Sequence, residues 1–120
     1  MPKYVDGFVI PIKKKNINAY KRMATWGCKT WMKYGALDYF ECVGDDLKVK
    51  FGISFSRMCK LKKDETAVFA FIVYKSKAHR NKVNAKVMKD PSMQCNENMK
   101  MPFDMKKFSY GGFKVLVSAR

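Results

Sequence analysis

The sequence of 120 residues contains no apolar run approaching the roughly 20 residues that a membrane-spanning helix requires, which argues against a transmembrane protein. Its first residues also lack the apolar core of a secretory signal, because Asp6 and Gly7 interrupt the early apolar stretch. At 48% hydrophobic and 14% aromatic residues, the chain is too apolar to be disordered. Its length fits one domain, which we expect to span residues 1–120.

Cysteine and histidine are scarce and scattered. Cys28, Cys42, Cys59 and Cys95 form no CxxC pair, and the single histidine, His79, has no cysteine within ten residues. Zinc sites need clustered ligands, so we expect no metal. No glycine-rich phosphate loop stands out, and we expect no cofactor. Isolated cysteines are typical of reduced thiols, so the sequence predicts a cytoplasmic protein.

Acidic residues are few: 10 stand against 25 basic ones, which gives a net charge of +15. Segments 13–33 and 75–89 contain no acidic residue at all. Only four of the 25 cations are arginine, and lysine suits loose phosphate attraction better than base reading. A solvated lysine face is the simpler interpretation. The alternative is a nucleic-acid surface made by two lysine-rich helices, with Lys21, Lys29, Lys82 and Lys86 as its contacts.

Hydrophobic periodicity and local stop signals predict six elements in the order βαββαβ. The strands are expected at 4–12, 36–43, 66–74 and 108–117, with one helix capped by Asn16 and ended by Gly35, and another from Ser76 to the Asp90-Pro91 pair. Residues 45–65 form a long connection with a strand or short helix around 49–58. This order is typical of the α+β ferredoxin-like fold, a four-stranded antiparallel sheet with both helices on one face.

The continuous apolar run at 66–74 predicts a central strand that is buried on both faces. We expect the centre of the core at Val68, Phe69, Phe71, Ile72 and Val73. Two helices cover only one face of the sheet, and a bare second face exceeds the apolar patch that soluble monomers expose. The sequence therefore predicts a homodimer joined across the sheet faces.

Several separated motifs resemble the YbaA-like family, a bacterial family of uncharacterised proteins with a dimeric α/β-barrel fold. They lie at 1–11, 39–46, 64–66, 74–76, 78–80, 83–88, 101–104 and 110–114, so the resemblance covers essentially the whole chain. The chain departs from the family pattern at Ser56 and Lys63, where proline is expected. No activity of the family can be transferred residue by residue.

The wider dimeric α/β-barrel superfamily includes cofactor-independent monooxygenases, haem-degrading enzymes and small-ligand binders, and fold alone does not choose among them. The resemblance thus implies a monooxygenase-like activity only at the level of the superfamily. Such enzymes use an apolar chamber with a few hydrogen-bond donors. Trp31, Tyr34, Tyr74 and Asn84 are side chains of that kind, although an aromatic stripe at helical spacing more often forms a core.

Three titratable residues are candidates for chemistry. His79 is the only side chain with an ordinary pKa near neutrality, so a general base would be assigned to it; the alternative is a packed histidine that satisfies one backbone group. Asp6 and Glu41 are carboxylates within apolar strands, and a pair with Arg80, Arg57 or Lys114 is their simpler explanation.

The leading hypothesis is a dimeric protein that binds or oxidises a small apolar or aromatic compound between the helices and the sheet. His79 and Asp6 would be its polar groups, with Trp31, Glu41, Tyr74 and Asn84 around the ligand. A loop that holds Met88, Met93, Met99, Met101 and Met105 would form a lid, or fill gaps at the dimer contact. The competing hypothesis is nucleic-acid binding, which salt dependence would distinguish.

Overall fold

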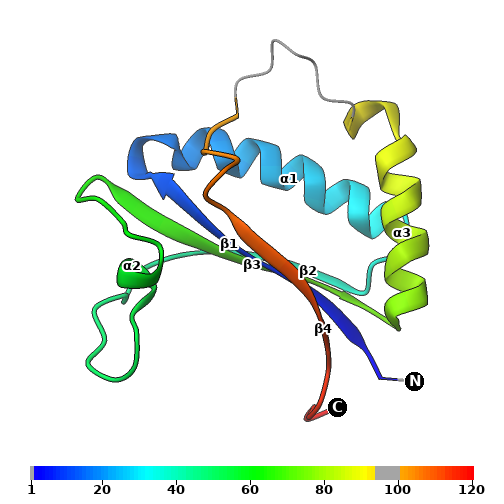
Figure 1. The fold of residues 1–120 in the computed structure, drawn as a ribbon. Coiled ribbons are helices and arrows are strands. Elements are labelled where there is room, and N and C mark those ends of the chain that lie inside the picture. The colour runs from blue at the N-terminus through cyan, green and yellow to red at the C-terminus, as the bar shows by residue number, and fades with distance from the viewer. Residues whose placement is uncertain (1, 94–100) are drawn as a thin grey trace.

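A computed structural model describes residues 2–93 and 101–120, which form a four-stranded antiparallel sheet with two long helices on one face (Figure 1). The elements are β1 (Tyr4–Lys13), η1 (Lys14–Asn16), α1 (Ile17–Lys33), β2 (Asp38–Val43), α2 (Phe55–Met58), β3 (Glu65–Tyr74), α3 (Lys77–Lys89), η2 (Pro91–Met93) and β4 (Ser109–Lys114). The strand order is β2-β3-β1-β4, so the first and third strands are central, as predicted. The βαββαβ order is confirmed, with the short α2 inserted before β3.

The register of β1 and β3 separates the two faces of the sheet. Pairing runs from Tyr4 opposite Tyr74 to Lys13 opposite Glu65, and side chains alternate between faces along each strand. Tyr4, Ile10 and Ile12 of β1 are buried beneath the helices. The other face carries no long helix, and we call it the helix-free face; its apolar side chains are Val5, Val9, Phe40, Phe69, Phe71 and Phe113.

The sequence predicted that β3 is buried on both faces, with a second copy over one of them, and within a single chain only the helix-covered face of β3 is buried. Val68 and Ile72 are 2% and 3% exposed, but Phe69 is 47% exposed, and Phe71 and Val73 are half-buried. The reason is the period of two: residues 69, 71 and 73 point to the helix-free face, which no long helix of the described chain covers. The core of the subunit therefore contains Val68 and Ile72 without the three predicted neighbours.

The helix boundaries follow local signals with one exception. Gly35, with φ of 110°, follows α1 in the left-handed conformation that glycine permits. Ser76 caps α3 by accepting a hydrogen bond from the His79 backbone N–H at 3.1 Å. Asn16 precedes α1 but its side chain makes no cap hydrogen bond; its Nδ2 donates instead to the Pro102 carbonyl at 3.1 Å. A contact 86 positions away replaces the predicted cap.

Both ends of the helix-free face carry exposed apolar side chains. In the connection 45–65, only Phe55–Met58 is helical, while Phe51 and Ile53 are 93% and 74% exposed. Strand β4 is shorter than predicted, although the Val115 N–H still donates to the Lys3 carbonyl at 2.9 Å. Beyond that bond the C-terminal tail leaves Leu116 and Val117 95% and 87% exposed. Among the described residues, no helix is long and apolar enough to cross a membrane.

Candidate functional site

Asp6 and Arg80 form an ion pair at the junction of β1 and α3. Arg80 Nη1 donates to Asp6 Oδ1 at 2.8 Å, and the guanidinium carbon lies 4.9 Å from the centre of the Tyr4 ring. Asp6 is only 5% exposed, so a cation is needed to offset its desolvation. Arg80 is one of the three partners that the sequence predicted.

Trp31, Tyr74 and Asn84 meet beside this pair. The Asn84 Oδ1 accepts hydrogen bonds from Trp31 Nε1 at 3.0 Å and from the Tyr74 hydroxyl at 3.1 Å. Tyr74 is fully buried, and burial together with the Asp6 carboxylate raises the pKa of its hydroxyl. The structure thus brings these three predicted residues together as a hydrogen-bonded unit that joins α1, β3 and α3.

Glu41 is held by two tyrosines in place of the predicted cation. Its carboxylate accepts from the Tyr20 hydroxyl at 2.6 Å and from the Tyr39 hydroxyl at 2.7 Å. Burial and the Glu41 charge raise the pKa of both hydroxyls. The Tyr39 ring lies 6.2 Å from the Trp31 ring, so the two clusters adjoin. The strand predicted at 36–43 contains both Tyr39 and Glu41, but their pairing was not predicted.

His79 lies in the first turn of α3, and its side chain bonds to the backbone just before that helix. Its Nδ1 accepts a hydrogen bond from the Lys75 backbone N–H at 3.0 Å, and its ring stands 6.0 Å from the Tyr74 ring. No hydrogen bond or ion pair within residues 2–93 and 101–120 joins His79 to Asp6. This geometry matches the packed-histidine alternative.

A third carboxylate, Asp90, was not singled out by the sequence. It accepts from the Tyr34 hydroxyl at 2.7 Å and from the Ser92 N–H and hydroxyl at 2.9 and 2.6 Å, with Lys33 Nζ at 3.5 Å. The hydrogen bonds from Ser92 and Tyr34 lower the pKa of this carboxyl. Asp90 therefore fastens the end of α3 to the end of α1.

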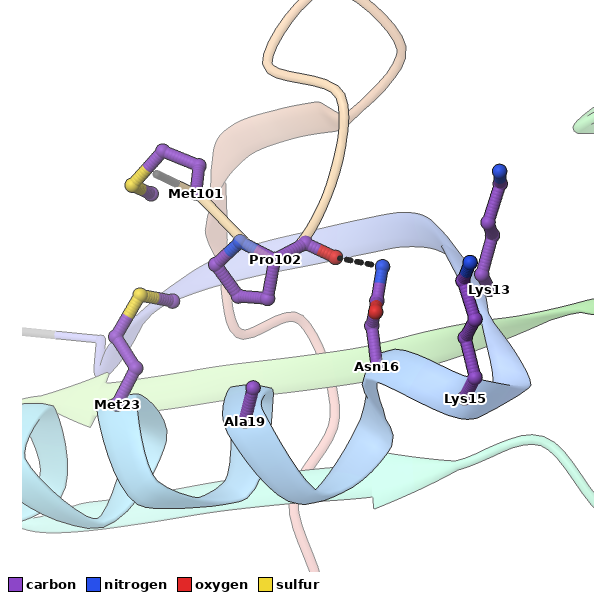
Figure 2. A pocket seen from close by; sticks show the side chains of 7 residues that line it. All are labelled: Lys13, Lys15, Asn16, Ala19, Met23, Met101 and Pro102. Carbon is purple, nitrogen blue, oxygen red and sulfur yellow. Dashed lines mark hydrogen bonds between the residues drawn. The ribbon is translucent and has the colours of Figure 1, made fainter. Parts of the chain in front are cut away.

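A groove of about 490 Å³ lies between the start of α1 and the segment that leads toward β4 (Figure 2). We call it the lysine–methionine groove; it is lined by Lys13, Lys15, Asn16, Ala19, Met23, Met101 and Pro102. Figure 2 shows the two lysines extending side by side at one end, with Met23 and Met101 at the other. The hydrogen bond from Asn16 to Pro102 holds its two walls together. The groove is therefore cationic at one end and apolar at the other.

The described methionines of the predicted lid lie in different surroundings. Met101 lines the groove, Met93 packs against the core, and Met88 and Met105 are 59% and 52% exposed. Met99 lies outside the described residues.

A second groove of about 300 Å³ opens on the helix-free face beside α2, and we call it the α2 groove. Its lining is almost wholly apolar: Val9, Cys42, Val43, Gly44, Leu47, Phe55, Ala67 and Phe69. A side-chain carbon at Gly44 would come within 2.7 Å of Leu47 and 2.8 Å of Thr66, so a larger residue at this turn would displace these side chains. Figure 1 shows the segment around α2 on the side of the sheet away from α1.

The four lysines of the nucleic-acid hypothesis lie on the two helices and are all exposed. No ion pair of the described residues involves Lys21, Lys29, Lys82 or Lys86. Cys28, Cys42 and Cys59 are free thiols, while Cys95 lies outside the described part of the chain. Across residues 2–93 and 101–120, no group of three His, Cys, Asp or Glu side chains is placed to hold a metal ion.

The sheet topology and the one-sided helix layer define a ferredoxin-like α+β protein. A solved structure described as a dimeric ferredoxin-like protein from an uncultured marine organism aligns with a TM-score of 0.59 at 14% identity, covering 99% of this chain and 100% of that one. The chain belongs to the family described as protein of unknown function (DUF1428), whose model matches residues 3–105. It is 36% identical over 115 residues to the uncharacterized protein YbaA of Escherichia coli K12 and to that of Shigella flexneri, covering 96% of this chain and 97% of each relative. The predicted YbaA-like family is confirmed.

Proposed function

We propose that the protein works as a homodimer in which each subunit binds a small molecule with an apolar or aromatic body and an anionic end. The observation that carries the ligand proposal is the lysine–methionine groove. Its volume of about 490 Å³ falls within the usual range of ligand sites. The ammonium groups of Lys13 and Lys15 attract an anion, and Met23, Met101 and Pro102 supply an adaptable apolar wall.

This proposal moves the ligand away from His79 and Asp6. Both groups have protein partners that explain their positions. The polar atoms of Trp31 and Tyr74 both donate hydrogen bonds to Asn84. The groove lining offers lysine, asparagine and apolar side chains, with no group whose ordinary pKa lies near neutrality. Binding without a reaction is therefore the function we propose for it.

The dimer is supported by the helix-free face. Phe40, Phe69 and Phe113 are each about half exposed there or more, at 50%, 47% and 60%. Phe40 stacks on Phe71 with ring centres 5.1 Å apart, so the aromatic surface is continuous across β2 and β3. Burying this surface against a second copy removes apolar area from water. The marine relative of the same fold is described as dimeric.

Fluorescence titration with two probes tests the ligand proposal. Anilinonaphthalene sulfonate carries an aromatic body and an anion, and phenylnaphthylamine is its uncharged analogue. We expect the double variant Lys13→Gln and Lys15→Gln to bind the sulfonate at least about tenfold more weakly and to bind the amine unchanged, because only the anion contacts ammonium groups. Met23→Gln should weaken both probes, since it makes the apolar wall polar.

The matched control is the double variant Lys21→Gln and Lys29→Gln, which removes the same charge from exposed positions of α1 outside the groove. An equal loss in both double variants would show a general charge effect and contradict the groove. RNA binding that falls steeply with salt and is lost in the control variant, without a sulfonate response, would favour the nucleic-acid hypothesis.

Sedimentation of the free protein tests the dimer independently. We expect a dimer at micromolar concentration, and we expect Phe40→Asp to shift it to monomer because it places a charge in the aromatic surface. The matched control is Met32→Asp on α1, where the methionine is similarly exposed at 43% but lies on the helix layer. A monomeric wild-type protein would contradict the dimer and leave the groove result unaffected.

A further inference from the structure

The α2 groove and the C-terminal tail are two exposed apolar features of matching chemistry. The groove has about 300 Å³ of space between β1, β2, β3 and α2, and its lining is almost entirely hydrocarbon and sulfur. Leu116 and Val117 are 95% and 87% exposed, and no apolar side chain among residues 2–93 and 101–120 covers them. Two adjacent aliphatic side chains this exposed are rare in a soluble protein unless a partner buries them.

The tail cannot enter the groove of its own subunit. Val115 is fixed by its hydrogen bond to Lys3, at the start of β1, whereas Val9 of the groove lies six positions further along that strand. Six strand residues span about 20 Å. The tail also leaves from β4, while Cys42 of the groove is on β2, at the opposite edge of the sheet, about 14 Å across three strand spacings. Leu116 and Val117 extend only about 7 Å beyond Val115.

We infer that Leu116 and Val117 of one subunit dock in the α2 groove of a second copy of the chain. This inference rests on the proposed dimer and names a contact that completes it. The groove is continuous with the helix-free face through Phe69 and Val9, which belong to both. In a two-fold symmetric dimer the contact occurs twice, because each subunit supplies one tail and one groove.

Cys42 makes the inference directly testable, because it is an exposed thiol in the groove lining. In a chain whose other cysteines are replaced by serine, Leu116→Cys or Val117→Cys should form a disulfide with Cys42 of the second copy when oxidised glutathione is supplied as oxidant. We expect a covalent dimer on a non-reducing gel, which Cys42→Ser abolishes. Asn18→Cys, on an exposed position of α1, is the control that should give no covalent dimer on the same gel.

A second measurement needs no disulfide. The double variant Leu116→Asp and Val117→Asp should weaken the dimer at least about tenfold in sedimentation, because the groove offers no partner for a carboxylate. Ser118→Asp with Ala119→Asp adds the same charge beyond the apolar pair and should leave the dimer unchanged.

The outcomes separate the two proposals. A wild-type dimer that gives no covalent dimer from either cysteine variant, and is weakened equally by both aspartate pairs, overturns the docking and leaves the dimer intact. A disulfide within one chain also overturns it. A wild-type monomer overturns the docking together with the proposed assembly.

Discussion

Gly27 lies in the middle of α1, where glycine normally costs about 1 kcal/mol relative to alanine. Its position is explained by Tyr39, because a side-chain carbon at residue 27 would stand 3.1 Å from the Tyr39 hydroxyl. That hydroxyl is fixed by its 2.7 Å hydrogen bond to Glu41, so it has little freedom to move. The helix therefore gives up intrinsic stability at this residue to approach the sheet closely.

We predict that Gly27→Ala fails to stabilise the protein, because the new methyl group displaces the Tyr39 hydroxyl from Glu41. In a Tyr39→Phe background the hydroxyl is absent, and the same substitution should then raise the free energy of unfolding by about 1 kcal/mol. Chemical denaturation of the four proteins measures this coupling. Equal effects of Gly27→Ala in both backgrounds would show that Tyr39 does not constrain residue 27.

The tyrosines of the helix–sheet layer predict a sensitivity to high pH. Burial and nearby carboxylates raise the pKa of Tyr20, Tyr39 and Tyr74 in the folded protein, while the unfolded chain has an ordinary pKa of about 10. Above that pH the unfolded chain releases protons that the folded protein keeps. Stability is therefore complete below pH 10 and declines as the pH rises further, by at most about 1.4 kcal/mol per pH unit for each tyrosine.

Ultraviolet absorbance of tyrosinate, followed together with circular dichroism, checks this expectation. The three tyrosines should ionise only as the protein unfolds, and Tyr39→Phe should reduce the steepness of the alkaline decline. Ionisation of all tyrosines in a protein that keeps its folded spectrum would contradict it.

At the scale of the element, β3 is a strand with two environments. Ile72 faces the helices and is 3% exposed, whereas Phe71 points to the helix-free face and stacks on Phe40. Ile72→Ala should lower the free energy of unfolding by about 2 to 5 kcal/mol at every protein concentration, because it leaves a cavity inside the subunit. The effect of Phe71→Ala should grow with protein concentration, since a second copy buries its ring in the proposed dimer.

Denaturation of both variants at two protein concentrations separates the faces. If the two substitutions respond identically to concentration, Phe71 is not covered by a partner. The sequence placed both residues in one central core, with a second copy of the chain covering the helix-free face; within residues 2–93 and 101–120 of a single chain, only Ile72 is fully covered.

The order of the elements could be predicted because its signals are local. Ser76 marks a helix start through its side-chain oxygen, and Gly35 and Pro91 mark helix ends through their backbone geometry. The apolar periods of 3.6 and 2 need only neighbouring residues. The pair of Asp6 with Arg80 was within reach of sequence reasoning, because a carboxylate in an apolar strand requires a cation.

The lysine–methionine groove was not predictable in the same way. It depends on Asn16 meeting Pro102, a contact over 86 positions that no local rule anticipates, and the local rule for asparagine predicted a helix cap instead. Lys13 and Lys15 appeared only as part of a charge run, and Met101 only as part of a methionine-rich loop. The fold brings residues 13–23 beside residues 101 and 102, and this contact cannot be inferred from the local sequence.

At the scale of the whole molecule, charge and apolar surface are separated. The net charge is +15, and Lys21, Lys29, Lys82 and Lys86 are carried by α1 and α3, on the side of the sheet opposite Phe40, Phe69, Phe71 and Phe113. The side chains that define the helix-free face are apolar, and charged residues stand at the ends of its strands, where Asp38 pairs with Val73 and Lys13 with Glu65.

This separation of charge and apolar surface favours some orientations over others when two copies of the protein approach. Two molecules that approach helix layer first repel each other, while two that approach with their helix-free faces bring little charge together, within a screening length of about 10 Å. In the proposed dimer the two helix layers and their lysines face outward. A third copy would then meet the same repulsion, so the lysines that make the chain basic would also oppose assembly beyond two copies.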